Sequence, residues 1–322
     1  MNPSKKLIAR KLVRLRIYEA KGIEYQHLFE RVMQYHDRNF TPVKPHGNVG
    51  DRKNDGYNRH SGQYFQVYAP ENPAAVDAPH KAAQKAANDF AGLRVHWQGS
   101  CPIREYRFAF NDHFLGSPPP LEDALSKIRT DHGIDAGVLL AKDLEDIVLG
   151  LPEDQMADIL GMVVPDAGIL DNVDFGVLGD VIRHVRRQRA PLQPNGLLKS
   201  LEFEAKLKFN GLSVELAGLL RVGAYQNEAV TDFFSKNSDF ARQHLRDHLS
   251  AMYVEIRAIH AANAQAATYV GDLVFVELWH RMTPPIPKER STDALAAQEA
   301  ALVVMAYYFE ACDVFESPDA TT

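Results

Sequence analysis

Apolar positions at the start of the chain recur every three or four residues. The repeat comprises Leu7, Ile8, Leu12, Leu15 and Tyr18, and this spacing predicts an amphipathic helix. Gly22 interrupts the pattern, which resumes over Glu24–Tyr35. Residues 5–36 are therefore predicted to form two helices with a break at the glycine.

Short aromatic or alternating runs predict strands further along the chain. They are Phe40–Val43, Gln63–Tyr68, Tyr106–Phe110 and Val138–Leu140. Helical patterns at 73–91, 119–131 and 152–161 lie between and after these strands. Because strands that alternate with helices are typical of an α/β domain, we place such a domain at residues 1–162.

Helical periodicity dominates the last third of the chain. It covers 212–222, 226–262, 268–281 and 291–311, so we predict an all-α C-terminal domain at 201–322. Residues 163–200 are mixed in pattern and contain the basic run Arg183–Arg189. We interpret this segment as a linker or the edge of an interface, whose arginines face either DNA or an acidic partner.

The composition is that of a soluble globular protein, with 45% hydrophobic and 24% charged residues. No segment reaches the roughly 20 apolar residues of a membrane helix, so we expect no membrane association. Two cysteines, Cys101 and Cys312, cannot build a disulfide framework and indicate a reducing compartment. We expect a cytoplasmic protein and interpret the acid-free first 18 residues as a structural helix, not a targeting segment.

Charge is distributed unevenly along the sequence. Residues 1–60 hold 13 Lys and Arg against 6 Asp and Glu, while the other 262 residues hold 23 against 36. A net charge of +7 on the first fifth, within a total of −6, indicates that this part faces an anionic partner such as nucleic acid. The alternative is a solvated basic helix without a partner.

Several common chemistries are missing from the sequence. It has no Gly-Lys-Ser/Thr phosphate loop, no GxSxG elbow and no CxxC pair, which argues against a P-loop ATPase, a serine hydrolase of that type and a CxxC redox or metal site. His244 and His248 have the spacing of two zinc ligands, but no acid follows His244 in the HExxH manner. We interpret that pair as part of a solvated helix face.

One turn carries candidate chemistry. Asp51 and Asp55 lie within Gly50–Tyr57, and Gln66 follows on the next predicted strand. A carboxylate in a turn and an oxygen ligand on the following strand can bind Mg²⁺, which activates water against a phosphodiester. The alternative is an ordinary Asn/Asp/Gly hairpin turn. An exposed turn residue adds little to a core, so we expect Asp55→Ala to leave the fold intact.

This turn resembles the Mrr-type branch of the restriction-endonuclease-like (PD-(D/E)XK) fold. That branch has a GD-x-x-x-DG turn before a Q-x-K strand, which Gly50–Gly56 and Gln66 match. It also has a helix start like Gly22–Gln26. The resemblance implies a mixed sheet flanked by helices, Mg²⁺ or Mn²⁺ as cofactor, and Asp55 and Gln66 as metal ligands.

The chain departs from this pattern at two positions. The catalytic lysine of the family falls at Tyr68, and the helix acid falls at Gln26. Glu30, one turn later, is the candidate substitute for the acid, and the substitute for the cation is Lys53 or one of Lys81 and Lys85. Asp51 is a further candidate catalytic residue. The alternative is that it only stabilises the turn. The implied DNA contacts are Arg52, Lys53 and Arg59.

Three further segments resemble a narrower family. They are Tyr64–Glu71, Phe110–Phe114 and Tyr307–Glu316, and they are similar to effector proteins of bacterial ABC three-component anti-phage systems, relatives of Lamassu. The resemblance implies an SMC-like ABC ATPase and a small middle component as partners. It also implies that the C-terminal domain docks a partner and that the ATPase activates the nuclease-like domain.

Three functions therefore remain open. The first is a metal-dependent DNA endonuclease that serves as a defence effector. The second is a catalytically inactive protein of the same fold that binds DNA or the ATPase, as Tyr68 and Gln26 would favour. The third is a protein-interaction module in which the Asp55 turn is only a turn. The sequence also leaves a homo-oligomer open.

Overall fold

The computed structural model describes residues 1–45, 47, 50–165, 174–188, 203–237, 242–262, 269–285, 291–311 and 314–316. The chain divides into two compact units. The α/β unit is Arg16–Leu160, and the helical unit joins Met1–Leu15 to Gly161–Thr322. Helix α1 (Pro3–Glu19) begins in the helical unit and ends in the α/β unit, whereas the sequence pattern placed all of it in the first domain.

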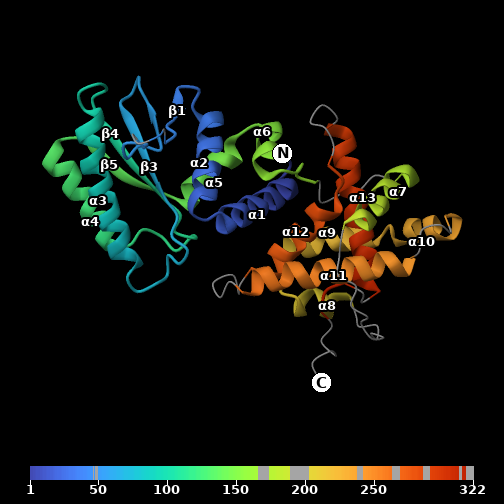
Figure 1. The fold of residues 1–322 in the computed structure, drawn as a ribbon. Coiled ribbons are helices and arrows are strands. Elements are labelled where there is room, and N and C mark those ends of the chain that lie inside the picture. The colour runs from blue at the N-terminus through green and yellow to red at the C-terminus, as the bar shows by residue number, and fades with distance from the viewer. Residues whose placement is uncertain are drawn as a thin grey trace. The chain divides into compact units, whose positions relative to one another are not determined.

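A five-stranded mixed sheet forms the centre of the α/β unit (Figure 1). Its strands are β1 (Phe40–Pro42), β2 (Gly56–Asn58), β3 (Gln63–Tyr68), β4 (Glu105–Phe110) and β5 (Asp135–Leu140), and they lie in sequence order. β1, β2 and β3 are antiparallel, while β3, β4 and β5 are parallel. The predicted mixed α/β class followed by helices is thus confirmed. β2 was not predicted because its three residues belong to the Asp55 turn.

Helices cover both faces of this sheet. They are α2 (Gly22–His36), α3 (Ala78–Trp97), α4 (Pro119–His132) and α5 (Ala141–Gly150), and α6 (Glu153–Leu160) packs against α2. On one face, Tyr64 of β3 packs in the hydrophobic core with α3 and α4. On the other face, Phe65 contacts Phe29 of α2. Because alternate residues of a strand point to opposite faces, Gln66 and Tyr68 lie on the α3 side with Tyr64.

Two helices of this unit differ from the sequence prediction. The helix expected at 73–91 begins only at Ala78 and runs to Trp97. Pro79 lies in the first turn of this helix, where its missing N–H costs no helical hydrogen bond, so it favours a helix start at this point. α5 was missed because it follows β5 directly and repeats its buried residues over only ten positions.

The helical unit contains seven described helices besides the start of α1. They are α7 (Phe175–Arg187), α8 (Phe203–Phe209), α9 (Val214–Ala224), α10 (Asn227–Lys236), α11 (Arg242–Ala261), α12 (Val270–Met282) and α13 (Ser291–Glu310). α13 packs against α7, α9, α10 and α12, and every residue from 300 to 309 is buried. A helix that is apolar on all sides is one that the others surround.

Part of the predicted linker at 163–200 is an ordered helix. α7 buries an apolar face that includes Leu178 and Val185, and Asp174 caps it by accepting from the N–H groups of Gly176 and Val177. Within the segment interpreted as a linker or the edge of an interface, residues 175–187 thus form a helix with a buried apolar repeat, which the basic side chains obscured. Arg189, Pro191 and Pro194 lie outside the described residues.

A buried lysine closes the C-terminal end of α13. Lys206 is 1% exposed, and its Nζ donates to the carbonyl oxygens of Phe309 and Val314, each at 2.7 Å. A cation at a helix C-terminus is favourable because the last carbonyls have no partner within the helix. These contacts connect α8 to Phe309 and Val314 within the helical unit. Across the described residues, none of the helices is long and apolar enough to cross a membrane.

We expect Lys206→Met to lower the free energy of unfolding by about 3 kcal/mol, because it leaves buried carbonyl groups without a charged donor. Lys208→Met is the matched control, since Lys208 is exposed on the same helix. That control should change stability by less than about 0.5 kcal/mol. Chemical denaturation of both variants measures the difference, and equal losses would contradict a structural role for Lys206.

Candidate active site

Asp55 is held against β3 by backbone hydrogen bonds. Its Oδ2 accepts from the N–H of Val67 at 2.6 Å, and its own N–H donates to the carbonyl of Phe65 at 3.1 Å. Its side chain is buried, since the residue is only 3% exposed. The expectation of an exposed turn residue is thus wrong, because the turn folds back over the strand that follows it.

The turn before Asp55 has an unusual backbone. Arg52 and Lys53 have φ angles of 54° and 61°, in the left-handed region that residues with a side chain rarely adopt. Asp51 Oδ1 accepts from the N–H of Lys53 at 2.8 Å. Asn54 Oδ1 likewise accepts from the N–H of Gly56. Asp51 therefore stabilises the turn, and a catalytic role for it stays a prediction.

Two buried polar atoms beside Asp55 have no hydrogen-bond partner among the described residues. They are Gln66 Oε1 and Asn54 Nδ2, and Gln66 is 5% exposed. Buried polar atoms are nearly always paired, so an unpaired one needs an explanation such as a water or ion. The unpaired oxygen of Gln66 is on the α3 side of the sheet, where a cation could use it.

A second buried carboxylate lies on α3, and the sequence analysis missed it. Asp89 is 3% exposed, and it accepts from Lys85 Nζ at 2.6 Å and Lys53 Nζ at 3.0 Å. A signal was present in the sequence. Asp89 is in helical register with the apolar face Ala82, Ala86 and Leu93, where a charged residue is unexpected.

These charged groups act on one another electrostatically. Burial raises the pKa of the Asp55 carboxyl to about 6, against the opposing effect of its bond to Val67. The negative charges of Asp51 and Asp89 raise this pKa further, and Lys85 lowers it. The pKa of Lys53 is raised, first by its hydrogen bond with Asp89. Ion pairs join Asp89, Lys53 and Lys85 into one charge cluster, and Asp55 follows Lys53 by two residues in the same turn.

Tyr68 occupies a packed position at the side of this cluster. Its ring stacks on Phe110 with centroids 6.0 Å apart, and Lys85 Nζ lies 5.7 Å from the Tyr68 ring centroid. Lys81 instead forms an ion pair with Asp77, and both are exposed. Of the three lysines proposed as substitute cations, Lys53 and Lys85 reach the cluster through Asp89.

Gln26 and Glu30 form a separate group on α2. Gln26 Nε2 donates to Glu30 Oε1 at 3.1 Å, and the other oxygen of Glu30 pairs with Lys44. Their neighbour Phe29 packs on the side of the sheet opposite Gln66. The described contacts thus join these residues to each other and leave the prediction that Glu30 completes the site without structural support.

The predicted DNA-binding residues remain accessible. Arg52 and Arg59 are exposed, and the side chain of Lys53 is 53% exposed. The carbonyl of Arg52 accepts from Trp97 Nε1 at 3.2 Å, which fixes the turn to the end of α3. A hydrogen bond with Tyr57 raises the pKa of Arg59. Their role in binding DNA stays a prediction.

The Phe110–Phe114 segment has a structural role at the end of β4. Asn111 Nδ2 donates to the carbonyls of Ile17 and Ala20, each at 3.0 Å. Asp112 Oδ1 accepts from the N–H of Ala141 at the start of α5. Burial lowers the pKa of His113 to about 4, and the charge of Lys21 adds to this effect. These residues connect elements of the α/β unit.

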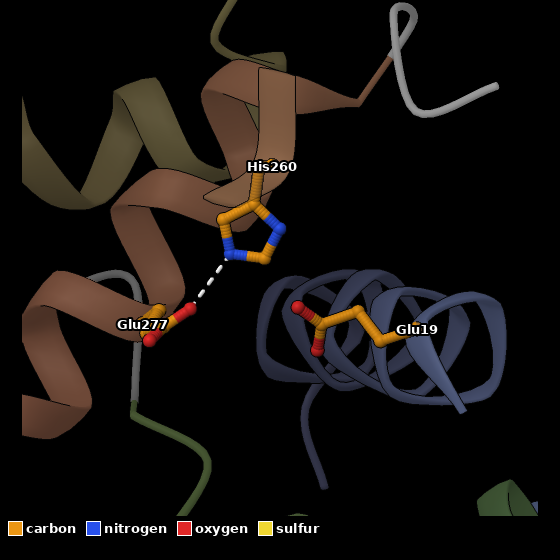
Figure 2. A group of neighbouring side chains, drawn as sticks. All are labelled: Glu19, His260 and Glu277. Carbon is orange, nitrogen blue, oxygen red and sulfur yellow. Dashed lines mark hydrogen bonds and ion pairs between the residues drawn. The ribbon is translucent and has the colours of Figure 1, made fainter. Parts of the chain in front are cut away.

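The helical unit contains an acid–histidine pair between α11 and α12. Figure 2 shows His260 of α11 bonded to Glu277 of α12, at 2.7 Å between Nε2 and Oε2. Arg281 also pairs with Glu277, and the pKa of Glu277 is lowered mainly by His260. We interpret this group as an interhelical ion pair. Glu19, also labelled there, belongs to the α/β unit.

The pKa of Asp55 predicts how the metal-free protein responds to acid. Because the folded-state pKa of about 6 exceeds the ordinary value of 3.8, the folded state binds more protons between these values. The Asp55 contribution to stability therefore rises as pH falls from 7 to 4, by up to about 3 kcal/mol. Denaturation in EDTA should show this gain in the wild type relative to Asp55→Asn. A difference between the two proteins that is constant over pH 4–7 would contradict it.

Comparison with known proteins concerns the helical unit. Residues 177–316 match the family model described as C-terminal domain 10 of the ABC-three component (ABC-3C) systems. No curated protein and no solved structure matches the chain. The matched segment begins within α7 and includes the Tyr307–Glu316 segment. Residues 177–316 thus carry the C-terminal domain of an ABC-three component system protein, and the chain is a component of such a system.

Proposed function

We propose that this protein is the metal-dependent DNA endonuclease of an ABC-three component anti-phage system. The observation that carries the proposal is a buried carboxylate, Asp55, on a turn next to a strand with a buried amide oxygen, Gln66 Oε1, that has no hydrogen-bond partner among the described residues. Both are oxygen ligands of the kind that Mg²⁺ or Mn²⁺ prefers. Their placement on a hairpin and the adjoining strand agrees with the resemblance to the restriction-endonuclease-like fold.

The residues present fit a divalent cation at this place. Asp55 and Gln66 would hold it, and when bound it supplies Lewis-acid activation of a water for attack on a phosphodiester. Lys85 and Lys53 carry positive charge to the same cluster, where they can stabilise a phosphate that gains negative charge. Arg52 and Arg59 are the proposed contacts to the DNA backbone, which would make affinity fall with salt.

The match of the helical unit supports partner proteins. ABC-three component systems comprise several components, and we propose that an SMC-like ABC ATPase and a small middle component act with this chain. In this proposal the ATPase engages foreign DNA and activates the α/β unit, while the helical unit provides the docking surface. A relation to Lamassu belongs to the same proposal.

A second candidate is a catalytically inactive adaptor that binds DNA or the ATPase. Three observations favour it. The two lysines of the cluster are already paired with Asp89, Gln26 and Tyr68 replace ionisable residues of the resembled family, and the described carboxylates Asp51, Asp55 and Asp89 do not form a compact three-ligand group. Cleavage by the complete system distinguishes the two functions.

We expect cleavage of plasmid DNA in Mg²⁺ or Mn²⁺ to fall at least a hundredfold in Asp55→Asn and to stop in EDTA. The asparagine keeps the shape of the side chain but loses the negative charge that binds the cation. The substrate should be incubated with the full chain alone and with its ATPase and middle component. Asp146→Asn is the matched control, because Asp146 is an exposed acid on α5.

Two outcomes would change the assignment. Undiminished cleavage by Asp55→Asn would remove Asp55 from the site. No cleavage by the complete system in the presence of phage DNA would reject the nuclease in favour of the adaptor.

A further inference from the structure

Asp89 is a buried acid with two lysine partners from different elements. Lys85 lies one turn earlier on α3, and Lys53 comes from the strained turn that precedes Asp55. Lys53 also crosses α3 closely, since a Cβ on Gly92 would lie 2.9 Å from its Cγ. We refer to Asp89, Lys53 and Lys85 as the Asp89 triad. It connects α3 to the turn of the candidate active site.

Asp89 lies on the face of α3 that borders the volume between α3 and the sheet, and Lys53, two residues before Asp55, reaches it from the turn at 3.0 Å. Both carboxylates act on the buried Tyr106 of β4, whose pKa is raised first by burial and then by these two charges. The Tyr106 hydroxyl donates to the carbonyl of Ala86, three residues before Asp89. Gln66, with its unpaired Oε1, is the partner of Phe108 across the β3–β4 ladder and projects to this same side.

The charges in this volume balance only because the lysines are present. Asp55 and Asp89 are each 3% exposed, and two buried carboxylates repel each other unless cations compensate them. In the metal-free protein the Asp89 triad supplies that compensation. A divalent cation can supply it equally, since it would compete with the two ammonium groups for the oxygens of Asp89.

We propose that Asp89 is a further ligand of the divalent cation, together with Asp55 and Gln66, and that Lys53 and Lys85 close the site in the metal-free state by occupying Asp89. This inference rests on the proposed function and adds its regulation. Binding of the cation would release both lysines, whose side chains are 53% and 33% exposed and can then reach a phosphate. By linkage, a polyanion that binds the released lysines should raise the affinity for the cation by the same factor by which the cation raises the affinity for the polyanion.

The test is a calorimetric titration of the full chain with Mn²⁺ alone, without DNA and without a measure of activity. Asp89→Asn should weaken Mn²⁺ binding at least tenfold, because it removes a charged ligand. Lys85→Met and Lys53→Met should each tighten binding several-fold, because a competitor for Asp89 is lost. In a separate titration, a 20-base-pair DNA duplex added to the wild type should also tighten Mn²⁺ binding, and it should have less effect in the double lysine variant.

Lys81→Met is the matched control, because Lys81 lies one turn before Lys85 but pairs with the exposed Asp77. It should leave Mn²⁺ affinity unchanged. Thermal melting of each variant checks the fold. Lys53→Met is the lysine variant least expected to disturb folding, because the Lys53 side chain is 53% exposed.

The outcomes separate the two proposals. Mn²⁺ binding that is lost in Asp55→Asn but unchanged in Asp89→Asn and in both lysine variants would overturn the role of Asp89 and keep the proposed function. Binding that is unchanged in Asp55→Asn but lost in Asp89→Asn would support Asp89 and remove Asp55 as a ligand. A wild type that binds no Mn²⁺ would overturn both.

Discussion

The hydrogen bond from the N–H of Val67 to Asp55 Oδ2 determines the geometry of the candidate site. It attaches the Asp55 side chain to the backbone of the strand that carries Gln66. The turn that precedes Asp55 has left-handed backbone at Arg52 and Lys53. Strain of this kind persists only where surrounding contacts determine the conformation, and here Asp51 and Trp97 provide them.

Burial of Asp55 has an electrostatic consequence that extends to α3. An acid removed from water favours its neutral form, and a second acid nearby increases this tendency. The protein compensates with Lys85 and Lys53, which pair with Asp89 and not with Asp55. Asp55 is therefore left with a raised pKa and one backbone donor. Through the Lys53–Asp89 pair, α3 contacts the turn that precedes Asp55.

The sequence predicted the elements that bear the site better than the contacts within it. Strand β3 and helix α2 were found because their apolar repeats are regular, and Asp55 was chosen from its turn. Its burial was not predictable, since a turn signal does not show whether the turn folds over a neighbouring strand. Glu30 was a reasonable substitute by spacing, but its partners Gln26 and Lys44 are set by tertiary packing. Asp89 was detectable as a charge on an apolar helix face, a signal that the Ala-rich pattern of α3 concealed.

Only the helical unit matches a known family model, and α1 is the element that the two units share. In the helical unit, Lys11 of α1 pairs with Asp272 at 2.5 Å, within the segment that matches an ABC-three component domain. In the α/β unit, the carbonyls of Ile17 and Ala20 at the end of this helix accept from Asn111, directly after β4. β4 also carries Tyr106, whose pKa is raised by burial and by the charges of Asp89 and Asp55. The end of α1 is thus connected by hydrogen bonds to the segment after β4, the strand that carries one wall of the candidate site.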